Sequence, residues 1–182
     1  MEKAIVSLQS YAKFSHHFIT FYPDVVNKEY REKEINECKE AVAFLKGEDI
    51  TFSSVPVLAM KILDLFLLDY QQDISNLLQL AESQEEPEKS KTYEKVTELT
   101  LQNTDFARAK ELIRRHTGKK KPYAVYLKKG ESKAFLTFLE PQMIQAKPYQ
   151  DFKDVWEVEL TETLLDYMRI FPPVDAIVHL DK

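Results

Sequence analysis

Apolar residues recur every three to four positions over residues 4–21, the spacing that places them on one face of an α-helix. This pattern predicts an amphipathic helix that ends before Pro23. A second helix is predicted from Asp24, whose side chain could cap the first turn, to Lys46. Gly47 then stands where helices commonly end in a left-handed residue.

A third helix is predicted over Val57–Leu68, where the residues are apolar on nearly every side. It should therefore be the most buried helix, and Ser53 or Ser54 could cap it. Residues 73–80 either continue this helix or form a separate turn. The polar residues 82–91 are typical of a linker or a frayed helix start.

Two shorter helices are predicted before Gly118. The first covers residues 92–102, and Asn103 or Thr104 could cap the second, over 105–117. Basic residues end this second helix, which complements the partial negative charge at a helix C-terminus.

After residue 118 the hydrophobic period changes from that of a helix to that of a strand. Residues 122–127 and 135–139 are rich in aromatic and aliphatic side chains, and residues 128–131 between them form a turn signal. These three segments predict a β-hairpin. The remaining predicted elements are a strand, a helix and a strand, over residues 155–160, 161–170 and 174–180.

The order of elements predicts an α+β fold. A bundle of about five helices would occupy residues 1–118, and a small sheet, made of the hairpin and two strands with one helix, would occupy residues 119–182. Because the helix over 105–117 runs directly into the first strand, the two regions could share one core.

Composition removes several classes of protein from consideration. Three Gly in 182 residues are too few for a dinucleotide-binding fingerprint or a P-loop. The sequence starts without the basic residues and continuous apolar run of a secretory signal, and its single Cys cannot form an internal disulfide. Its most apolar stretch, Val55–Leu68, is interrupted by Lys61 and Asp64 and is too polar to span a membrane. We therefore expect a cytoplasmic protein with Cys38 reduced, no membrane association and no cofactor.

Charge is distributed unevenly along the chain. Between Arg108 and Lys133, ten basic residues stand against two acidic ones, a local charge of +8 in a chain whose net charge is −5. The rest of the chain therefore carries −13. The candidate set for binding a partner or an anion combines basic residues with two neighbouring tyrosines: Arg108, Lys110, Arg114, Arg115, Lys119, Lys120, Lys121, Tyr123, Tyr126, Lys128 and Lys129.

Three interpretations of this basic segment are open. It could bind an acidic protein, or it could hold nucleic-acid phosphates while Tyr123 and Tyr126 stack on bases. It could also be a solvated edge, or a surface that docks on the chain's own acidic helices. The net acidity of the chain disfavours a general nucleic-acid binder. We expect a non-enzymatic interaction or regulatory protein with an acidic partner, and a nucleic-acid-binding accessory protein is the alternative.

Patterns for nucleophilic catalysis and metal binding are weak. Cys38 lies on the apolar stripe of the second predicted helix, a position typical of a buried, inert thiol. His16 and His17 are adjacent on a helix, so their side chains diverge by about 100° and cannot chelate one ion together. We therefore predict no metal site.

Paired carboxylates keep a small enzyme as a second alternative. Glu157 with Glu159 would share one strand face, and Asp64 with Asp69 would lie on a mostly apolar helix. Asp64 has Lys61 three residues before it, so an ion pair within the helix is the expected arrangement.

Overall fold

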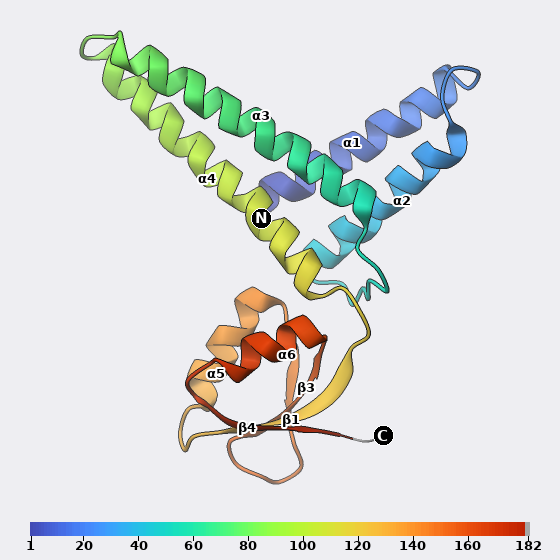
Figure 1. The fold of residues 1–182 in the computed structure, drawn as a ribbon, viewed down its shortest axis with the longest axis vertical. Helices are drawn as coiled ribbons and strands as arrows, with labels where there is room; N and C mark the ends of the chain where they lie inside the picture. The colour runs from blue at the N-terminus through green and yellow to red at the C-terminus, as the bar shows by residue number, and fades with distance from the viewer. Residues whose placement is uncertain (181–182) are drawn as a thin grey trace. The chain divides into compact units, whose positions relative to one another are not determined.

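The structure, a computed structural model, describes residues 1–180 and contains a helical N-terminal part followed by a small sheet (Figure 1). Its first elements are four helices: α1 (Glu2–Phe21), α2 (Lys28–Leu45), α3 (Val57–Glu82) and α4 (Glu88–Arg115). The elements that follow are β1 (Lys121–Leu127), α5 (Ser132–Leu139), the 3-10 helix η1 (Glu140–Gln142), β2 (Ala146–Pro148), β3 (Val155–Leu160), α6 (Glu162–Arg169) and β4 (Val174–His179). The predicted α+β class is confirmed, with four N-terminal helices over the described residues rather than about five.

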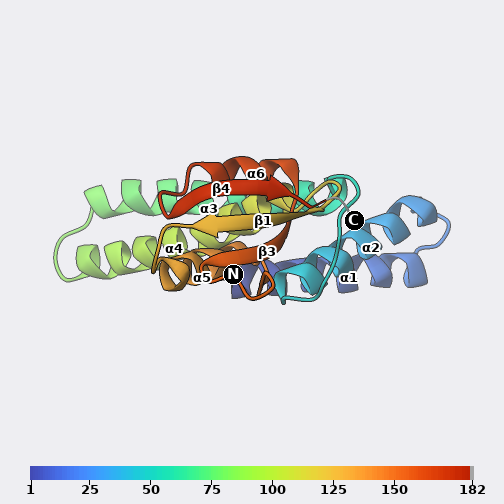
Figure 2. The same ribbon diagram turned by 90° about the horizontal axis from the view of Figure 1, so that it is seen from below.

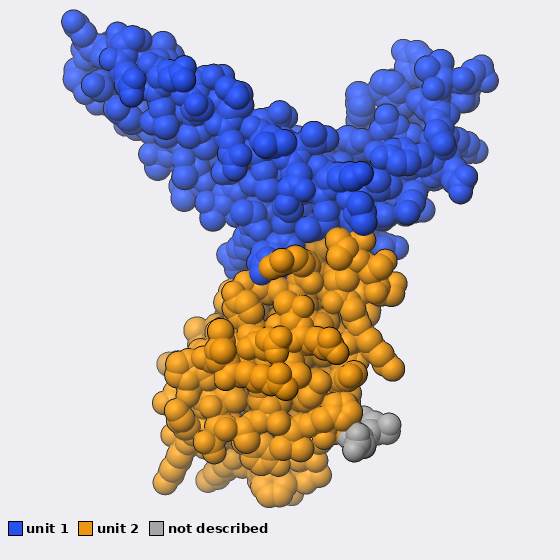
Figure 3. All heavy atoms as spheres, viewed as in Figure 1, with its two compact units in different colours: residues 1–50, 56–111 blue, residues 51–55, 112–182 orange. Residues whose placement is uncertain are grey.

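The chain divides into two compact units (Figure 3). Unit 1 contains residues 1–50 and 56–111, and unit 2 contains residues 51–55 and 112–182. The short segment 51–55 belongs to unit 2 because Phe52 forms a parallel bridge with Thr117. The carbonyl of Phe52 also accepts a hydrogen bond from the N–H of Gly118 at 2.7 Å.

In unit 1, α1 and α2 form a helical hairpin (Figures 1 and 2). Asn27 caps α2, because its Oδ1 accepts a hydrogen bond from the N–H of Tyr30 at 3.0 Å. The prediction that Asp24 is this cap is therefore wrong, since Asp24 lies in the preceding turn. Gly47 follows α2 with φ +90°, the left-handed conformation expected of a glycine that stops a helix.

A buried carboxylate joins these two helices. Glu34 of α2 accepts a hydrogen bond from the hydroxyl of Tyr11 at 3.1 Å and one from Arg31 at 2.7 Å. Burial, together with the nearby Glu34 carboxylate, raises the pKa of Tyr11. The charge of Glu34 is tolerated inside the hairpin because both of these donors satisfy it.

The start of α3 is held by a side chain from α2. Oε2 of Glu37 accepts hydrogen bonds from the N–H groups of Leu58 at 2.6 Å and Ala59 at 3.3 Å. The cap therefore comes from a distant carboxylate rather than from Ser53 or Ser54, and those two predictions are wrong. A negative charge at this end also complements the helix dipole.

Helix α3 is longer and more exposed than predicted. It runs unbroken to Glu82, so residues 73–80 continue it. Ile62 and Leu63 are buried, whereas Leu65 and Leu68 are 57% and 60% exposed. Residues 57–68 are apolar on nearly every side, but only one side of this segment is packed. The prediction that this is the most buried helix is therefore wrong, since the shorter α2 has more buried residues.

Helix α4 is one continuous helix where two were predicted. No break occurs at Asn103 or Thr104. Instead, the Thr104 hydroxyl donates to the carbonyl of Thr100 at 3.0 Å, within the helix. Phe106 anchors this region to α3, because its ring stacks on that of Phe66 with centroids 5.5 Å apart. Packing against α3 thus overrides the local capping signal.

Unit 2 contains an antiparallel sheet with strand order β2-β3-β1-β4. On the central strand β1, Val125 stands opposite Trp156 of β3 and Ile177 of β4. Helices α5 and α6 lie on one face of this sheet (Figures 1 and 2). The core between them contains the buried residues Tyr123, Val125, Leu127, Phe135, Leu139, Ile144, Val158, Leu160, Leu164, Leu165 and Met168.

The predicted hairpin is wrong in its second strand, because residues 135–139 lie in α5. Phe135 and Leu139, four residues apart, are buried, whereas Leu136 and Thr137 are exposed. That spacing belongs to a helix rather than to the alternation of a strand. The turn at residues 128–131 therefore connects a strand to a helix, and β1 pairs with β3 and β4 instead.

The other C-terminal predictions are confirmed. Strands form within 155–160 and 174–180, and a helix forms within 161–170. Thr161 caps that helix, since its hydroxyl accepts from the N–H of Leu164 at 3.3 Å. The short strand β2 has no counterpart among the predicted elements.

Candidate functional site

The basic segment does not form one patch in unit 2, because strand β1 divides it. Lys121 begins β1 and Leu127 ends it, so the flanking basic groups are separated by roughly 20 Å of extended chain. We call Arg114, Lys119, Lys120 and Lys121 the helix-end group, and Lys128, Lys129 and Lys133 the turn group.

The first two candidates, Arg108 and Lys110, belong to unit 1. Arg108 is exposed. Lys110 forms an ion pair with Asp64 of α3. The prediction that Lys61 is the partner of Asp64 is therefore corrected: the partner comes from α4. Asp64 is the one carboxylate in the apolar part of α3, and its ion pair with Lys110 gives it a structural role.

Arg115 is built into the framework of unit 2. Its guanidinium donates to Oε1 of Gln142 at 2.5 Å and to the hydroxyl of Tyr167 at 2.6 Å, and it lies 3.8 Å from the centroid of the Tyr167 ring. Its carbonyl accepts a hydrogen bond from the buried hydroxyl of Thr161 at 2.5 Å. These contacts tie the end of α4 to η1 and α6, so Arg115 is occupied in holding the fold.

His116, beside Arg115, is only 2% exposed. Its Nε2 donates to the carbonyl of Gln142 at 2.7 Å. Burial lowers the pKa of His116, and the positive charges of Lys120 and Arg115 lower it further, while the hydrogen bond to Gln142 opposes them. The imidazole is therefore neutral near pH 7 and does not add to the basic surface.

The two candidate tyrosines do not share one surface. Tyr123 is 8% exposed and contributes to the core on the helix-covered face, where its ring meets His179 edge-on at 5.3 Å. Tyr126 is three residues along the same strand and therefore points to the opposite face. The two rings consequently do not form a single stacking platform beside the lysines.

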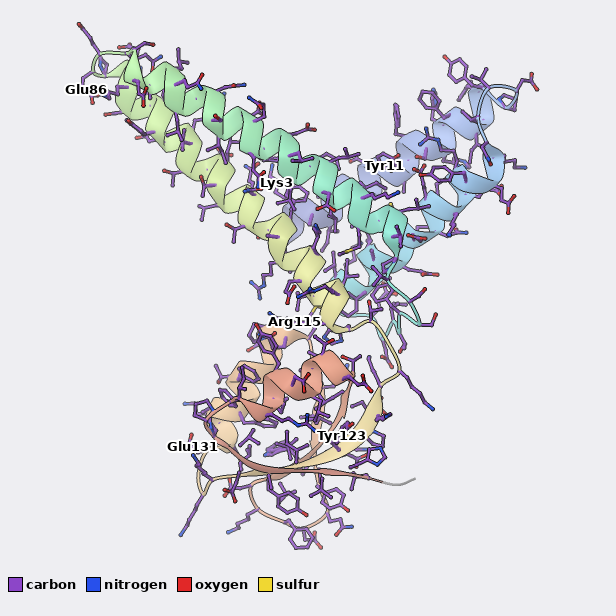
Figure 4. All side chains as sticks on the ribbon, viewed as in Figure 1. Lys3, Tyr11, Glu86, Arg115, Tyr123 and Glu131 are labelled. Atoms are coloured by element: carbon purple, nitrogen blue, oxygen red, sulfur yellow. The ribbon has the colours of Figure 1, made fainter. Side chains whose placement is uncertain are left out.

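The turn between β1 and α5 is held in a defined conformation. Asp154 accepts hydrogen bonds from the hydroxyl of Ser132 at 2.7 Å and from the N–H of Gly130 at 3.2 Å. Trp156 Nε1 donates to the same Ser132 hydroxyl at 3.1 Å. The pKa of Asp154 is lowered, chiefly by the hydrogen bond from Ser132 and then by that from Gly130. The positive charges of Lys153 and Lys129 lower it further. Figure 4 shows Glu131 in this turn, at one end of the sheet.

An open pocket lies beside this turn, with a volume of about 630 Å³. Its lining consists of Gly130, Lys133, Ala134, Thr137, Phe138 and Phe171. Phe138 of α5 stacks on Phe171 with ring centroids 4.0 Å apart and planes inclined by 14°. The pocket thus has an apolar floor and a lysine at its edge.

Sequence reasoning missed this pocket. The signal that could have found it is the spacing of Ala134, Thr137 and Phe138, which share one face of a helix but not one face of a strand. Because residues 135–139 were predicted as a strand, this face was not recognised. Phe171 comes from the connection between α6 and β4, and no local pattern links it to α5.

The carboxylate pairs of the enzyme alternative are not brought together as a site. Glu157 forms an ion pair with Lys147 of β2 at 3.3 Å, whereas Glu159 is exposed. Asp64 is paired with Lys110, and Asp69 is exposed.

Cys38 is buried, and burial raises the pKa of its thiol to about 12, with Glu34 and Glu37 adding to the effect. The predicted buried thiol is confirmed. Over residues 1–180 no cluster of three or more potential metal ligands is found, and no helix there is long and apolar enough to cross a bilayer.

Comparison of the chain with protein-family models found no matching family, and comparisons with curated proteins and with solved structures found no significant match. Interpretation of the site therefore depends on its own geometry and charge.

Proposed function

We propose that this is a cytoplasmic, non-enzymatic interaction protein that binds an acidic segment of a partner protein through the turn group of unit 2. The observation that carries the proposal is the position of Lys133 at the edge of an apolar pocket, immediately after the turn that holds Lys128 and Lys129. Cationic side chains next to an apolar depression suit a protein ligand, which offers carboxylates and apolar groups together.

The turn group is favoured over the helix-end group for two reasons. First, Lys128, Lys129 and Lys133 are exposed, while the turn that carries Lys128 and Lys129 is fixed by hydrogen bonds to Asp154. A fixed turn reduces the conformational entropy lost on binding. Second, Arg115 beside the helix-end group is already engaged by Gln142 and Tyr167.

Charge also bears on the choice of partner. The chain has a net charge of −5, so an acidic partner is repelled by most of the molecule and attracted only where lysines gather. This contrast favours one orientation of encounter. For nucleic acid, Tyr123 and Tyr126 face opposite sides of the sheet and provide no shared stacking surface, so the base contacts expected of this pair are lost.

The test compares two double charge reversals at opposite ends of β1. K128E/K129E alters the turn group, and the matched control K119E/K121E alters exposed lysines of the helix-end group. The probe is a fluorescein-labelled peptide of glutamate and aspartate, and binding is measured by fluorescence anisotropy at low salt and at about 150 mM salt.

We expect K128E/K129E to weaken binding by roughly 10-fold at low salt, because each reversed lysine replaces an attraction with a repulsion. K119E/K121E should change binding much less. Equal losses in both variants, or no binding by the wild-type protein, would refute the proposal. Tighter binding of a single-stranded oligonucleotide than of the acidic peptide would replace it with the nucleic-acid alternative.

A further inference from the structure

The pocket beside the turn group has the construction of a receptor for one large apolar side chain. Ala134, Thr137 and Phe138 form one face of α5, and Phe171 stacks on Phe138 from the connection after α6. Stacking fixes both rings, so the floor is formed before any ligand arrives. The depression is open to solvent, and its volume of about 630 Å³ exceeds that of one side chain, so a single anchor would cover the floor without filling the space.

The charges at this site select the ligand. Lys133 lines the pocket, and Lys128 and Lys129 precede Gly130, which lines it too. Two carboxylates stand beside these lysines: Glu131 within the turn, and Asp154, which accepts hydrogen bonds from Ser132 and Gly130. Because Lys128, Lys129 and Lys133 outnumber them, the turn keeps a net positive charge next to the apolar floor.

We infer that this pocket binds a phenylalanine, tryptophan or leucine side chain of the partner, flanked within a few residues by aspartate or glutamate. The inference rests on the proposed function and adds the identity of the anchor. An aromatic or large aliphatic side chain would pack on Phe138 and Phe171, and the flanking carboxylates would meet the turn-group lysines. Such a central apolar anchor with a charged rim is how many protein interfaces obtain affinity and specificity.

The energetic expectation follows from burial. Removing a large apolar side chain from water strengthens binding by roughly 10- to 100-fold in Kd. The charge contribution is separate, because it falls as salt screens it, whereas the apolar contribution does not.

The experiment uses the full-length protein and two acidic peptides that differ at one central position, phenylalanine in one and alanine in the other. The pocket is filled by Ala134→Trp, and the matched control is Leu136→Trp, on the same helix but outside the pocket lining. Both residues are exposed, so both variants should retain the fold, which circular dichroism and thermal unfolding check.

We expect the wild-type protein and L136W to bind the phenylalanine peptide roughly 10- to 100-fold more tightly than the alanine peptide. In A134W this ratio should fall to about one, while affinity for the alanine peptide stays unchanged. K128E/K129E should weaken binding of both peptides and preserve much of the difference in affinity between the phenylalanine peptide and the alanine peptide.

The outcomes separate this inference from the proposed function. If both peptides bind the wild-type protein equally and with salt dependence, the acidic-partner proposal stands and the pocket inference fails. If neither peptide binds, both fail. If the wild-type protein dimerises in sedimentation equilibrium and A134W abolishes the dimer, the pocket receives a second copy of the chain, and the assignment to an acidic partner is overturned.

Discussion

Glu37 offers the sharpest test of how unit 1 is held together. Its Oε2 accepts hydrogen bonds from the N–H groups of Leu58 at 2.6 Å and Ala59 at 3.3 Å, so one side chain on α2 satisfies two donors at the start of α3. We expect Glu37→Ala to destabilise the protein because it leaves both N–H groups without this acceptor.

Three estimates bound the size of the effect. A hydrogen bond to a charged acceptor contributes about 1.5–3 kcal/mol, loss of a helix cap costs about 0.5–2 kcal/mol, and a negative charge at a helix N-terminus contributes about 0.3–1 kcal/mol. These estimates describe overlapping parts of one interaction, and the bond to Ala59 is long. We therefore expect E37A to lower the free energy of unfolding by about 2–3 kcal/mol.

Urea unfolding followed by far-UV circular dichroism measures this loss. With a slope of about 2 kcal/mol/M, the midpoint should fall by about 1–1.5 M urea. Glu37→Gln retains an oxygen acceptor but loses the charge, so it should fall between the wild-type protein and E37A. The control is Glu40→Ala, an exposed position on the same helix. A loss below about 0.5 kcal/mol for E37A, or one equal to that of E40A, would refute the capping argument.

Two further predictions concern titration and reactivity. Burial lowers the pKa of His116 below its ordinary value of 6.5, so the unfolded chain binds a proton more readily than the folded chain does. The contribution of neutral His116 to the free energy of unfolding is therefore fully present above pH 6.5. It should be lost as the pH falls from 6.5 toward the lower pKa of the folded state, which unfolding followed by Trp156 fluorescence measures. His116→Gln should remove this part of the pH dependence, and an unchanged profile in H116Q would contradict it. Burial and the nearby carboxylates of Glu34 and Glu37 raise the pKa of Cys38 to about 12, so iodoacetamide at about pH 8 should leave the native thiol unmodified and label it after unfolding. Rapid labelling of the native protein would show that the thiol is accessible.

Several elements were predictable because local signals agree with packing. The strand β3 alternates apolar and acidic residues, and its apolar residues Val158 and Leu160 belong to the unit 2 core. Gly47 stops α2 where the left-handed conformation is required. In these places the local preference and the tertiary environment demand the same structure.

Prediction failed where distant contacts decide the structure. Helix α3 begins at a carboxylate that lies some twenty residues upstream, on Glu37, and no local cap reveals it. The apparent break in α4 is overridden by packing of Phe106 on α3. Residues 135–139 have the composition of a strand, and only the joint burial of Phe135 and Leu139 identifies the helix.

The candidate site was partly predictable for the same reason. The excess of basic residues between Arg108 and Lys133 is visible in the sequence, because charge is counted without knowledge of the fold. Its division by β1 is not visible, since that depends on which residues are extended. The pairing of Phe138 with Phe171 is equally hidden, because the two rings come from segments 33 residues apart that meet only in the folded unit.

The bridge between Phe52 and Thr117 makes unit 2 discontinuous in the chain. During synthesis, segment 51–55 leaves the ribosome long before its partner and must wait for more than sixty further residues. Because the entropy of closing a flexible loop grows only slowly with its length, the entropic cost of closing this bridge from the unfolded chain depends little on the lengths of α3 and α4. A fragment that starts at residue 112 lacks the carbonyl that receives the Gly118 N–H. A minimal version of unit 2 would instead join residue 55 to residue 112 by a short linker and keep both sides of the bridge.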